Sequence, residues 1–189
     1  MISIWTDTET TGLDPRDSGA FEIALLVYDD AKLLDEKLYH LNPLNEEIRF
    51  SDEAYQVNGV SEETIRSYPP MEKVVPEIVE LLKKYVPPEK YVFAGYNCNF
   101  DYGHLGALFF RCGFNIGDYF NEKFIDVLER VRMAREQGFL VLDKKYNNKL
   151  ETITKALGVA HDDAHTALSD IKATRQLYEA LYLIWRKNK

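Results

Sequence analysis

The sequence predicts an α/β fold, in which a mixed β-sheet is flanked by helices. Three strand-like segments come first, and the turn signal Asp29-Asp30 between the second and the third indicates an antiparallel hairpin. After them, stretches with helical spacing alternate with short apolar segments, an order typical of parallel strands joined by helices. We therefore expect three antiparallel strands followed by parallel strands, with helices on both faces of the sheet.

Local patterns predict the individual elements. The strands are expected at residues 2–7, 21–28, 33–41, 91–94 and 124–127. Ser51 and Ser61 each open a short helix, because serine is a common residue just before the first helical turn. Apolar residues at helical spacing predict longer helices at residues 71–85, 99–112, 149–157 and 164–185, with a further helix that ends near residue 136.

Length and composition indicate one domain, residues 1–189, large enough to bury a core without disulfides. No apolar stretch is long enough to span a membrane. The N-terminus runs straight into the first strand, without the basic and apolar segments of a signal peptide. Cys98 and Cys112 form no paired zinc-ligand pattern, and we expect both to be reduced thiols. A cytoplasmic location follows as the expectation.

The charge of the chain limits how it can contact nucleic acid. A formal net charge of −8 argues against a protein that coats nucleic acid with a broad basic surface. It does not exclude an enzyme that grips a few nucleotides, because bound divalent metals would neutralise charge at the site. The most basic stretch, residues 130–149, either contacts a phosphate backbone or forms an exposed helix followed by a solvated loop.

Three acidic clusters are the main functional signal. Asp7 and Glu9 follow the first strand, and their spacing places them on the same side of an extended chain. Asp101 enters from the first turn of one predicted helix and Asp170 from another. Carboxylates that converge in a fold need cations, and oxygen ligands of this kind suit Mg²⁺ or Mn²⁺. His165 lies five residues before Asp170, so we place it at the helix start or on the preceding loop, where it can accept a proton from water.

The three clusters differ in how specific they are. With 31 acids in 189 residues, an acid-x-acid pair is expected about five times by chance, so Asp7-x-Glu9 alone says little. Asp101 alone is equally consistent with a helix cap. The pattern His165-x-Ala167-x-x-Asp170 has a chance expectation of about one in fifty in this composition. Together, in this order, the clusters indicate a two-metal hydrolase that acts on phosphate esters.

The same motifs resemble a known family. They are Thr-Asp-Thr-Glu-Thr-Thr-Gly-Leu at 6–13, Asn-Gly-Val-Ser-Glu-Glu at 58–63, Tyr-Asn-Cys-Asn-Phe-Asp at 96–101, Ile-Asp-Val at 125–127, Lys-Leu-Glu-Thr-Ile at 149–153 and Ala-His-Thr-Ala-Leu-Ser-Asp at 164–170. Over nearly the whole chain the sequence resembles the DnaQ-like, RNase T-type 3′–5′ exonucleases, the DEDDh group. It departs at Asn58, where the family usually has histidine, a position outside the predicted metal site.

The resemblance implies an RNase H-like fold and a role for each residue of the site. Asp7, Glu9 and Asp170 would hold one metal, Asp7 would also reach a second, and Asp101 would support that second metal directly or through water. His165 would deprotonate the attacking water. The two Mg²⁺ or Mn²⁺ ions would clamp the attacking and leaving oxygens of an in-line displacement. The product would be a nucleoside 5′-monophosphate released from the 3′ end.

The resemblance also implies how the substrate binds. The backbone around Thr10, Gly12 and Leu13 would cradle the terminal nucleotide, and Asn97 and Phe100 would shape its pocket, where a base can stack on the aromatic ring. Single-stranded 3′ ends of DNA or RNA are the expected partners, and no motif distinguishes the two. The chain stops at Lys189, soon after the last predicted helix, which favours a free-standing enzyme; a homodimer and an association with DNA polymerase stay open.

Two other interpretations compete with the exonuclease. His161 and His165 would share a face if both lay on a helix, and could then bind Zn²⁺ as in a metallopeptidase. No third ligand is evident, and we expect His161 to be a surface or loop residue instead. The second alternative is a catalytically silent module that binds 3′ ends or serves a polymerase. Silent relatives usually lose a metal carboxylate or the histidine, and neither is missing here.

Three further polar residues have structural interpretations. Glu22 lies inside an apolar strand, either as a buried hydrogen-bonded carboxylate or on a polar face of that strand. Asp126 is expected to cap the helix that follows its strand. His104 lies one turn after Asp101, and we expect it on an exposed helix surface.

Overall fold

The computed structural model describes residues 1–85, 90–143, 146–162 and 165–188. Its five-stranded sheet has the order β3-β2-β1-β4-β5. The strands are β1 (Ile2–Thr10), β2 (Ala20–Asp29), β3 (Lys32–His40), β4 (Tyr91–Gly95) and β5 (Phe120–Asp126). The first three pair antiparallel, and β4 and β5 add to β1 in parallel. This arrangement confirms the predicted mixed sheet.

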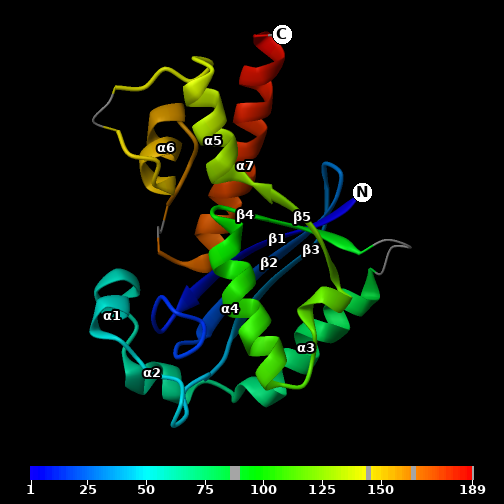
Figure 1. Cartoon of the computed structure of the whole chain (residues 1–189), viewed down its shortest axis with the longest axis vertical. Helices are drawn as coiled ribbons and strands as arrows, with labels where there is room; N and C mark the ends of the chain where they lie inside the picture. The colour runs from blue at the N-terminus through cyan, green and yellow to red at the C-terminus, as the bar shows by residue number, and fades with distance from the viewer. Residues whose placement is uncertain (86–89, 144–145, 163–164, 189) are drawn as a thin grey trace.

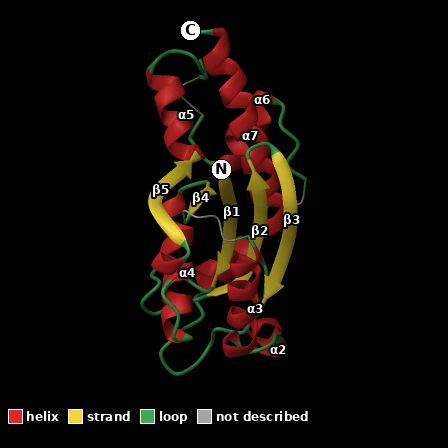
Figure 2. Cartoon of the chain, turned by 90° about the vertical axis from the view of Figure 1, so that its right-hand side faces the viewer, coloured by secondary structure: helices red, strands yellow, loops and turns green. Residues whose placement is uncertain are grey.

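Helices cover both faces of the sheet (Figures 1 and 2). They are α1 (Asp52–Asn58), α2 (Glu62–Ser67), α3 (Met71–Lys84), α4 (Cys98–Arg111), α5 (Val127–Glu136), α6 (Leu150–Leu157) and α7 (Ala167–Lys187), with a short 3₁₀ turn at Ile116–Asp118. Ile4 of β1 packs into a core shared with α3 and α4. Trp5, the next residue, points to the opposite face and packs into a core shared with α5, α6 and α7, as strand alternation requires.

Capping explains where several helices begin. The hydroxyls of Ser51 and Ser61 accept hydrogen bonds from the backbone N–H groups of Ala54 and Thr64, as the sequence predicted. Helix α7 begins later than expected, at Ala167, because the preceding loop carries a left-handed backbone. The predicted start of that helix at residue 164, and residues 144–145 of the basic stretch, lie outside the described residues.

Strand β5 begins at Phe120, four residues earlier than predicted. Its first half is an edge strand with exposed polar side chains, so its composition does not mark it as a strand. In the part of the chain that the structure describes, no helix is long and apolar enough to cross a membrane.

The sheet pairing also positions the acidic residues. Strand β4 pairs with β1 only along Ser3, Ile4 and Trp5. Beyond Trp5, β1 continues through Asp7 and Glu9 with β2 as its sheet neighbour. The acids therefore lie where β1 extends past β4, on the stretch of β1 that α4 approaches. In α/β sheets, ligands commonly bind beyond the carboxyl ends of the strands at the point where the strand order reverses, which in this sheet is between β1 and β4.

Candidate active site

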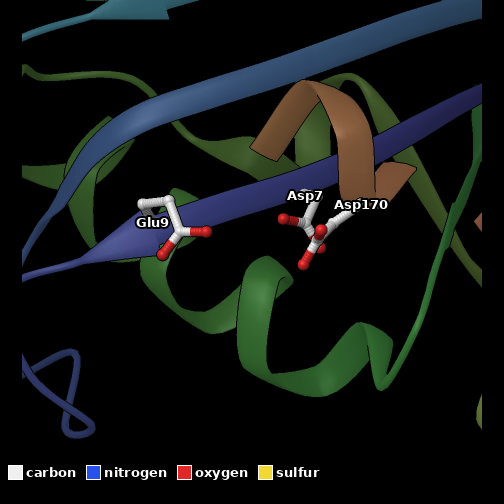
Figure 3. A group of neighbouring side chains, drawn as sticks. All are labelled: Asp7, Glu9 and Asp170. Atoms are coloured by element: carbon white, nitrogen blue, oxygen red, sulfur yellow. The ribbon is translucent and has the colours of Figure 1, made fainter. Parts of the chain in front are cut away.

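Three carboxylates converge at this place (Figure 3). Asp7 and Glu9 project from the same face of β1, and Asp170 projects from the first turn of α7. One oxygen of each carboxylate lies within 4.8 Å of the corresponding oxygens of the other two. All three side chains are partly buried. The structure thus brings Asp170 next to two acids that lie more than 150 positions earlier in the sequence.

The electrostatics of this group favour a bound cation. Burial, together with the negative charges of Asp101, Asp170 and Glu9, raises the pKa of Asp7 well above its ordinary value. Burial and the charges of Asp170 and Glu22 raise the pKa of Glu9 to about 8. Carboxylates this close must bind protons or a cation to relieve their repulsion. Because all the donors are hard oxygens, the residues present fit Mg²⁺ or Mn²⁺.

Asp101 lies beside this group but outside it. Its Oδ1 accepts hydrogen bonds from the backbone N–H of Thr8 at 2.9 Å and from the Thr8 hydroxyl at 2.8 Å. Burial raises the pKa of Asp101 to about 7, although the Thr8 hydrogen bonds act in the opposite direction. Thr8 lies between Asp7 and Glu9 on β1 and points to the other face of the strand. This one strand therefore presents two acids to α7 and fixes a third acid on α4.

His165 lies on the loop before α7, as its spacing from Asp170 predicted. Its side chain is exposed, its backbone is left-handed with φ of 73°, and its backbone N–H donates to Asp170 Oδ1 at 3.2 Å. His161 lies on the same loop, so the two histidines do not share a helix face. The geometry required by the zinc interpretation is therefore not formed.

The sequence predicts that His161 is a surface or loop residue, and the structure places it in a loop but not on the surface. Its side chain is only 6% exposed, and its Nε2 lies 2.7 Å from Asp170 Oδ1. The His161 ring points inward against Asp170 in the first turn of α7. No periodic pattern in the sequence marks a loop residue of this kind for burial.

The expectation that His104 is exposed is wrong, since the residue is 1% exposed. Its Nε2 lies 3.1 Å from Ser18 Oγ, and its Nδ1 lies 3.1 Å from the carbonyl oxygen of Phe100. Arg111 of the same helix donates to carbonyl oxygens of Pro15 and Ser18. The segment that connects β1 to β2 thus covers this face of α4, a long-range contact that helical spacing does not report.

Two interpretations of Glu22 followed from the sequence, and the structure confirms that it is a buried, hydrogen-bonded carboxylate. It lies directly opposite Glu9 in the β1–β2 register. One oxygen accepts from the backbone N–H of Ala167 at 2.8 Å, and the other lies 2.8 Å from His40 Nε2. Ala167 is the first residue of α7, where N–H groups lack partners within the helix. Glu22 therefore docks the start of α7, and with it Asp170, onto the sheet.

Asp126 caps α5, as predicted, by accepting from the backbone N–H of Glu129. It also accepts from the backbone N–H groups of Asn97 and Cys98, at 3.3 and 2.9 Å, where α4 begins. One carboxylate at the end of β5 therefore ties together the starts of two helices, and α4 is the helix that carries Asp101.

A pocket of about 280 Å³ opens beside Glu9. Its lining includes Thr10, Gly12, Leu13 and Phe100, together with residues of α1. These are four of the five residues predicted to hold a terminal nucleotide. The fifth, Asn97, is exposed at the start of α4 and is not part of this lining.

The end of β1 and the loop that follows it form one wall of the pocket, accept a hydrogen bond from α1 and have little free space around Gly12. Asn58, where the resemblance departs from its family pattern, lies in the lining and donates from Nδ2 to the carbonyl oxygen of Thr10 at 3.3 Å. Gly12 leaves little space for a side chain, because a Cβ there would lie 3.0 Å from Ser18 Cβ. Leu13 is 84% exposed and lies in the lining of the pocket.

Several known proteins are similar in sequence to this chain. A family model, RNase_T, described as "Exonuclease", matches residues 4–178. Among curated relatives, a DNA polymerase III PolC-type protein of Thermotoga petrophila is 27% identical over 172 residues, covering 91% of this chain and 11% of the relative. The 3′-5′ exonuclease DinG of Bacillus subtilis is 27% identical over 173 residues, covering 91% and 16%. An oligoribonuclease of Vibrio parahaemolyticus is 26% identical over 179 residues, covering 89% and 87%.

Solved structures show the same fold. Exonuclease I superposes with a TM-score of 0.83 at 21% identity, over 96% of this chain and 41% of that chain. Escherichia coli exonuclease I in complex with a dA16 oligonucleotide gives a TM-score of 0.81 at 20% identity, again over 96% and 41%. These matches confirm the RNase H-like fold. The chain corresponds to a small part of the PolC-type and DinG relatives and to less than half of exonuclease I.

Proposed function

This chain belongs to the exonuclease family, a family of nuclease hydrolases, and from that premise we propose that it removes nucleotides from the 3′ end of single-stranded DNA or RNA. The observation that carries this proposal is the convergence of Asp7, Glu9 and Asp170, whose carboxylate oxygens lie within 4.8 Å of one another beside a pocket open to solvent. The functional unit proposed is residues 1–189.

The carboxylates would hold two divalent cations, Mg²⁺ or Mn²⁺. Asp7, Glu9 and Asp170 would hold one cation, Asp7 would be shared between the two, and Asp101 would support the second directly or through water. Such a pair supplies positive charge that stabilises the attacking and leaving oxygens of an in-line displacement at phosphorus. Thr8 holds Asp101 by two hydrogen bonds, so this acid keeps one orientation while substrate enters and leaves.

His165 is the residue we propose as the general base. It is exposed to the solvent that supplies the attacking water, and its backbone is tied to Asp170. Imidazole can accept a proton near neutral pH, which suits the deprotonation of water during attack. The leaving group would be the 3′-oxygen of the shortened strand, and the product a nucleoside 5′-monophosphate.

The pocket beside Glu9 would take the terminal nucleotide. The Phe100 ring offers a surface on which a base can stack, and Leu13 lies at the rim, where the next base would pass. The names of similar proteins support both DNA and RNA as substrates, since one relative is an oligoribonuclease and a structural neighbour was solved with the oligonucleotide dA16. Phe100 and Leu13 are sequence-tolerant contacts, so we propose little preference among bases.

A second candidate function is a 3′-end-binding module associated with a DNA polymerase, which the PolC-type relatives favour. Every predicted metal carboxylate and the proposed base are present in this chain, and this favours an active enzyme. The cytoplasmic location expected from the sequence stays a prediction, and the homodimer stays an open alternative.

Matched single-stranded DNA and RNA oligonucleotides, labelled at the 5′ end, test the proposal. Each is incubated with Mg²⁺, Mn²⁺, Zn²⁺ or chelator, beside the Asp7→Asn variant. We expect a ladder that shortens from the 3′ end with Mg²⁺ or Mn²⁺ in the wild type alone. Absence of cleavage under all conditions would leave the end-binding module, and cleavage with Zn²⁺ alone would revive the zinc hydrolase.

A further inference from the structure

We infer that His161 is a positioning residue that orients the Asp170 carboxylate for metal binding and ties the loop carrying His165 to it. The inference rests on the proposed function, because it assigns to His161 a role in the metal site proposed above. Its basis is a chain of partly buried polar contacts that runs from α6 through His161 to the first turn of α7.

The contact between His161 and Asp170 has the geometry of a charge-assisted hydrogen bond. The distance from Nε2 to Oδ1 is 2.7 Å, and the two side chains are 6% and 19% exposed. An ionised carboxylate can only accept, so Nε2 is the donor. Burial of the ring leaves little water to compete for this carboxylate oxygen.

The same oxygen, Oδ1, also accepts from the backbone N–H of His165 at 3.2 Å. The two donors therefore bind the same oxygen of Asp170. Within the described residues, the second oxygen, Oδ2, accepts no hydrogen bond and is free to bind a cation beside Asp7 and Glu9. The shared acceptor links both His161 and His165 to the Asp170 carboxylate, so the proposed base and the proposed ligand are positioned together.

The other side of the His161 ring is fixed by α6. Its Nδ1 lies 3.3 Å from the hydroxyl oxygen of Thr154, a residue that is 1% exposed. That hydroxyl lies 2.9 Å from the carbonyl oxygen of Leu150 and 3.1 Å from that of Glu151, within the same helix. A ring contacted at both nitrogens by buried groups has a defined orientation. Helix α6 therefore supports the first turn of α7 through this histidine.

His161 acts through Asp170 rather than as a ligand itself. Among the described residues, the group whose ligand atoms lie within 4.8 Å of one another contains Asp7, Glu9 and Asp170 and not His161. Binding a metal through Nε2 would require loss of the 2.7 Å hydrogen bond to Asp170. Partners that orient a metal ligand typically change metal affinity by about 10–100-fold when they are removed.

Metal affinity measured without nucleic acid tests this inference. Binding of Mn²⁺ is followed by isothermal titration calorimetry in the wild type, His161→Leu and His161→Gln, with circular dichroism to confirm the fold. We expect His161→Leu to weaken Mn²⁺ binding by about 10–100-fold. His161→Gln should recover most of that loss, because its amide N–H₂ can reach the position of Nε2 and donate to Asp170.

Unchanged Mn²⁺ affinity in folded His161→Leu would overturn the inference, as would equal losses in the leucine and glutamine variants. If His161→Leu does not fold, Thr154→Val carries the test, since it removes the hydroxyl with little change of shape. Weaker Mn²⁺ binding is then expected, and unchanged binding overturns the inference. Asp7→Asn separates the two proposals: if it too binds Mn²⁺ like the wild type, the metal site itself is wrong.

Discussion

Raising the pH should destabilise this protein when a chelator removes divalent metal. The folded structure raises the pKa of Glu9 from 4.5 to about 8, and that of Asp101 from 3.8 to about 7. Between the unfolded and folded values, each group holds a proton in the folded state that the unfolded chain has released. Stability therefore falls as the pH rises through this window, the opposite of the behaviour of a salt-bridged carboxylate.

The size of the effect follows from the same two pKa values. Between pH 6 and pH 8, linkage predicts a loss of about 2 kcal/mol from Glu9 and about 1 kcal/mol from Asp101. For a chain of this length, the combined loss of about 3–4 kcal/mol corresponds to a fall in Tm of about 6–16 °C. Bound Mn²⁺ should reverse the trend, because it binds the ionised carboxylates and so stabilises the folded state more at pH 8 than at pH 6.

Thermal unfolding followed by circular dichroism at pH 6, 7 and 8 in chelator measures this directly. Glu9→Gln is the matched control, since it keeps the shape and removes the titration. We expect the wild type to lose about 2 kcal/mol more than this variant between pH 6 and pH 8. Equal pH dependence in the two proteins, or a wild type that gains stability relative to Glu9→Gln as the pH rises, would refute the reasoning.

Two further substitutions test individual residues. His165→Ala should lower turnover by about 10²–10⁴-fold, while Mn²⁺ affinity stays near the wild-type value. The pH–rate profile of the variant should also lose the rise in rate that comes from deprotonation of the base. An unchanged profile would argue against His165 as the general base. Glu22→Ala leaves the buried N–H of Ala167 without an acceptor, so we expect a loss of about 1–3 kcal/mol in urea unfolding and weaker Mn²⁺ binding through a displaced Asp170. Loss of stability with unchanged Mn²⁺ affinity would confine Glu22 to a structural role.

The parts of the fold that local patterns determine could be predicted from the sequence. Alternating and continuous apolar segments located all five strands, and the Ser51 and Ser61 hydroxyls marked two helix starts. The acids could also be anticipated as a group, because Asp7 and Glu9 share a side of one strand and Asp170 lies in the first turn of a helix.

What could not be predicted depends on contacts between distant segments. His104 looks exposed by its helical position, yet the β1–β2 connection covers it. The His161 side chain is buried against Asp170 on α7, a contact that no composition rule specifies. The role of Glu22 could not be predicted either, because it depends on the first residue of α7 lying within hydrogen-bond distance of β2. His161 and Glu22 contact the first turn of α7, which carries Asp170. The sequence therefore predicted the convergence of the carboxylates more completely than the contacts that hold them in place.

The most direct test of the account identifies the product chemically. A single-stranded oligonucleotide with a 5′ label is digested with Mn²⁺ by the wild type and, in parallel, by Asp7→Asn, and mass spectrometry identifies what is released. The account predicts nucleoside 5′-monophosphates and a stepwise shortened, 5′-labelled strand in the wild type, with neither in the variant. Internal fragments, nucleoside 3′-monophosphates or equal activity in Asp7→Asn would contradict it.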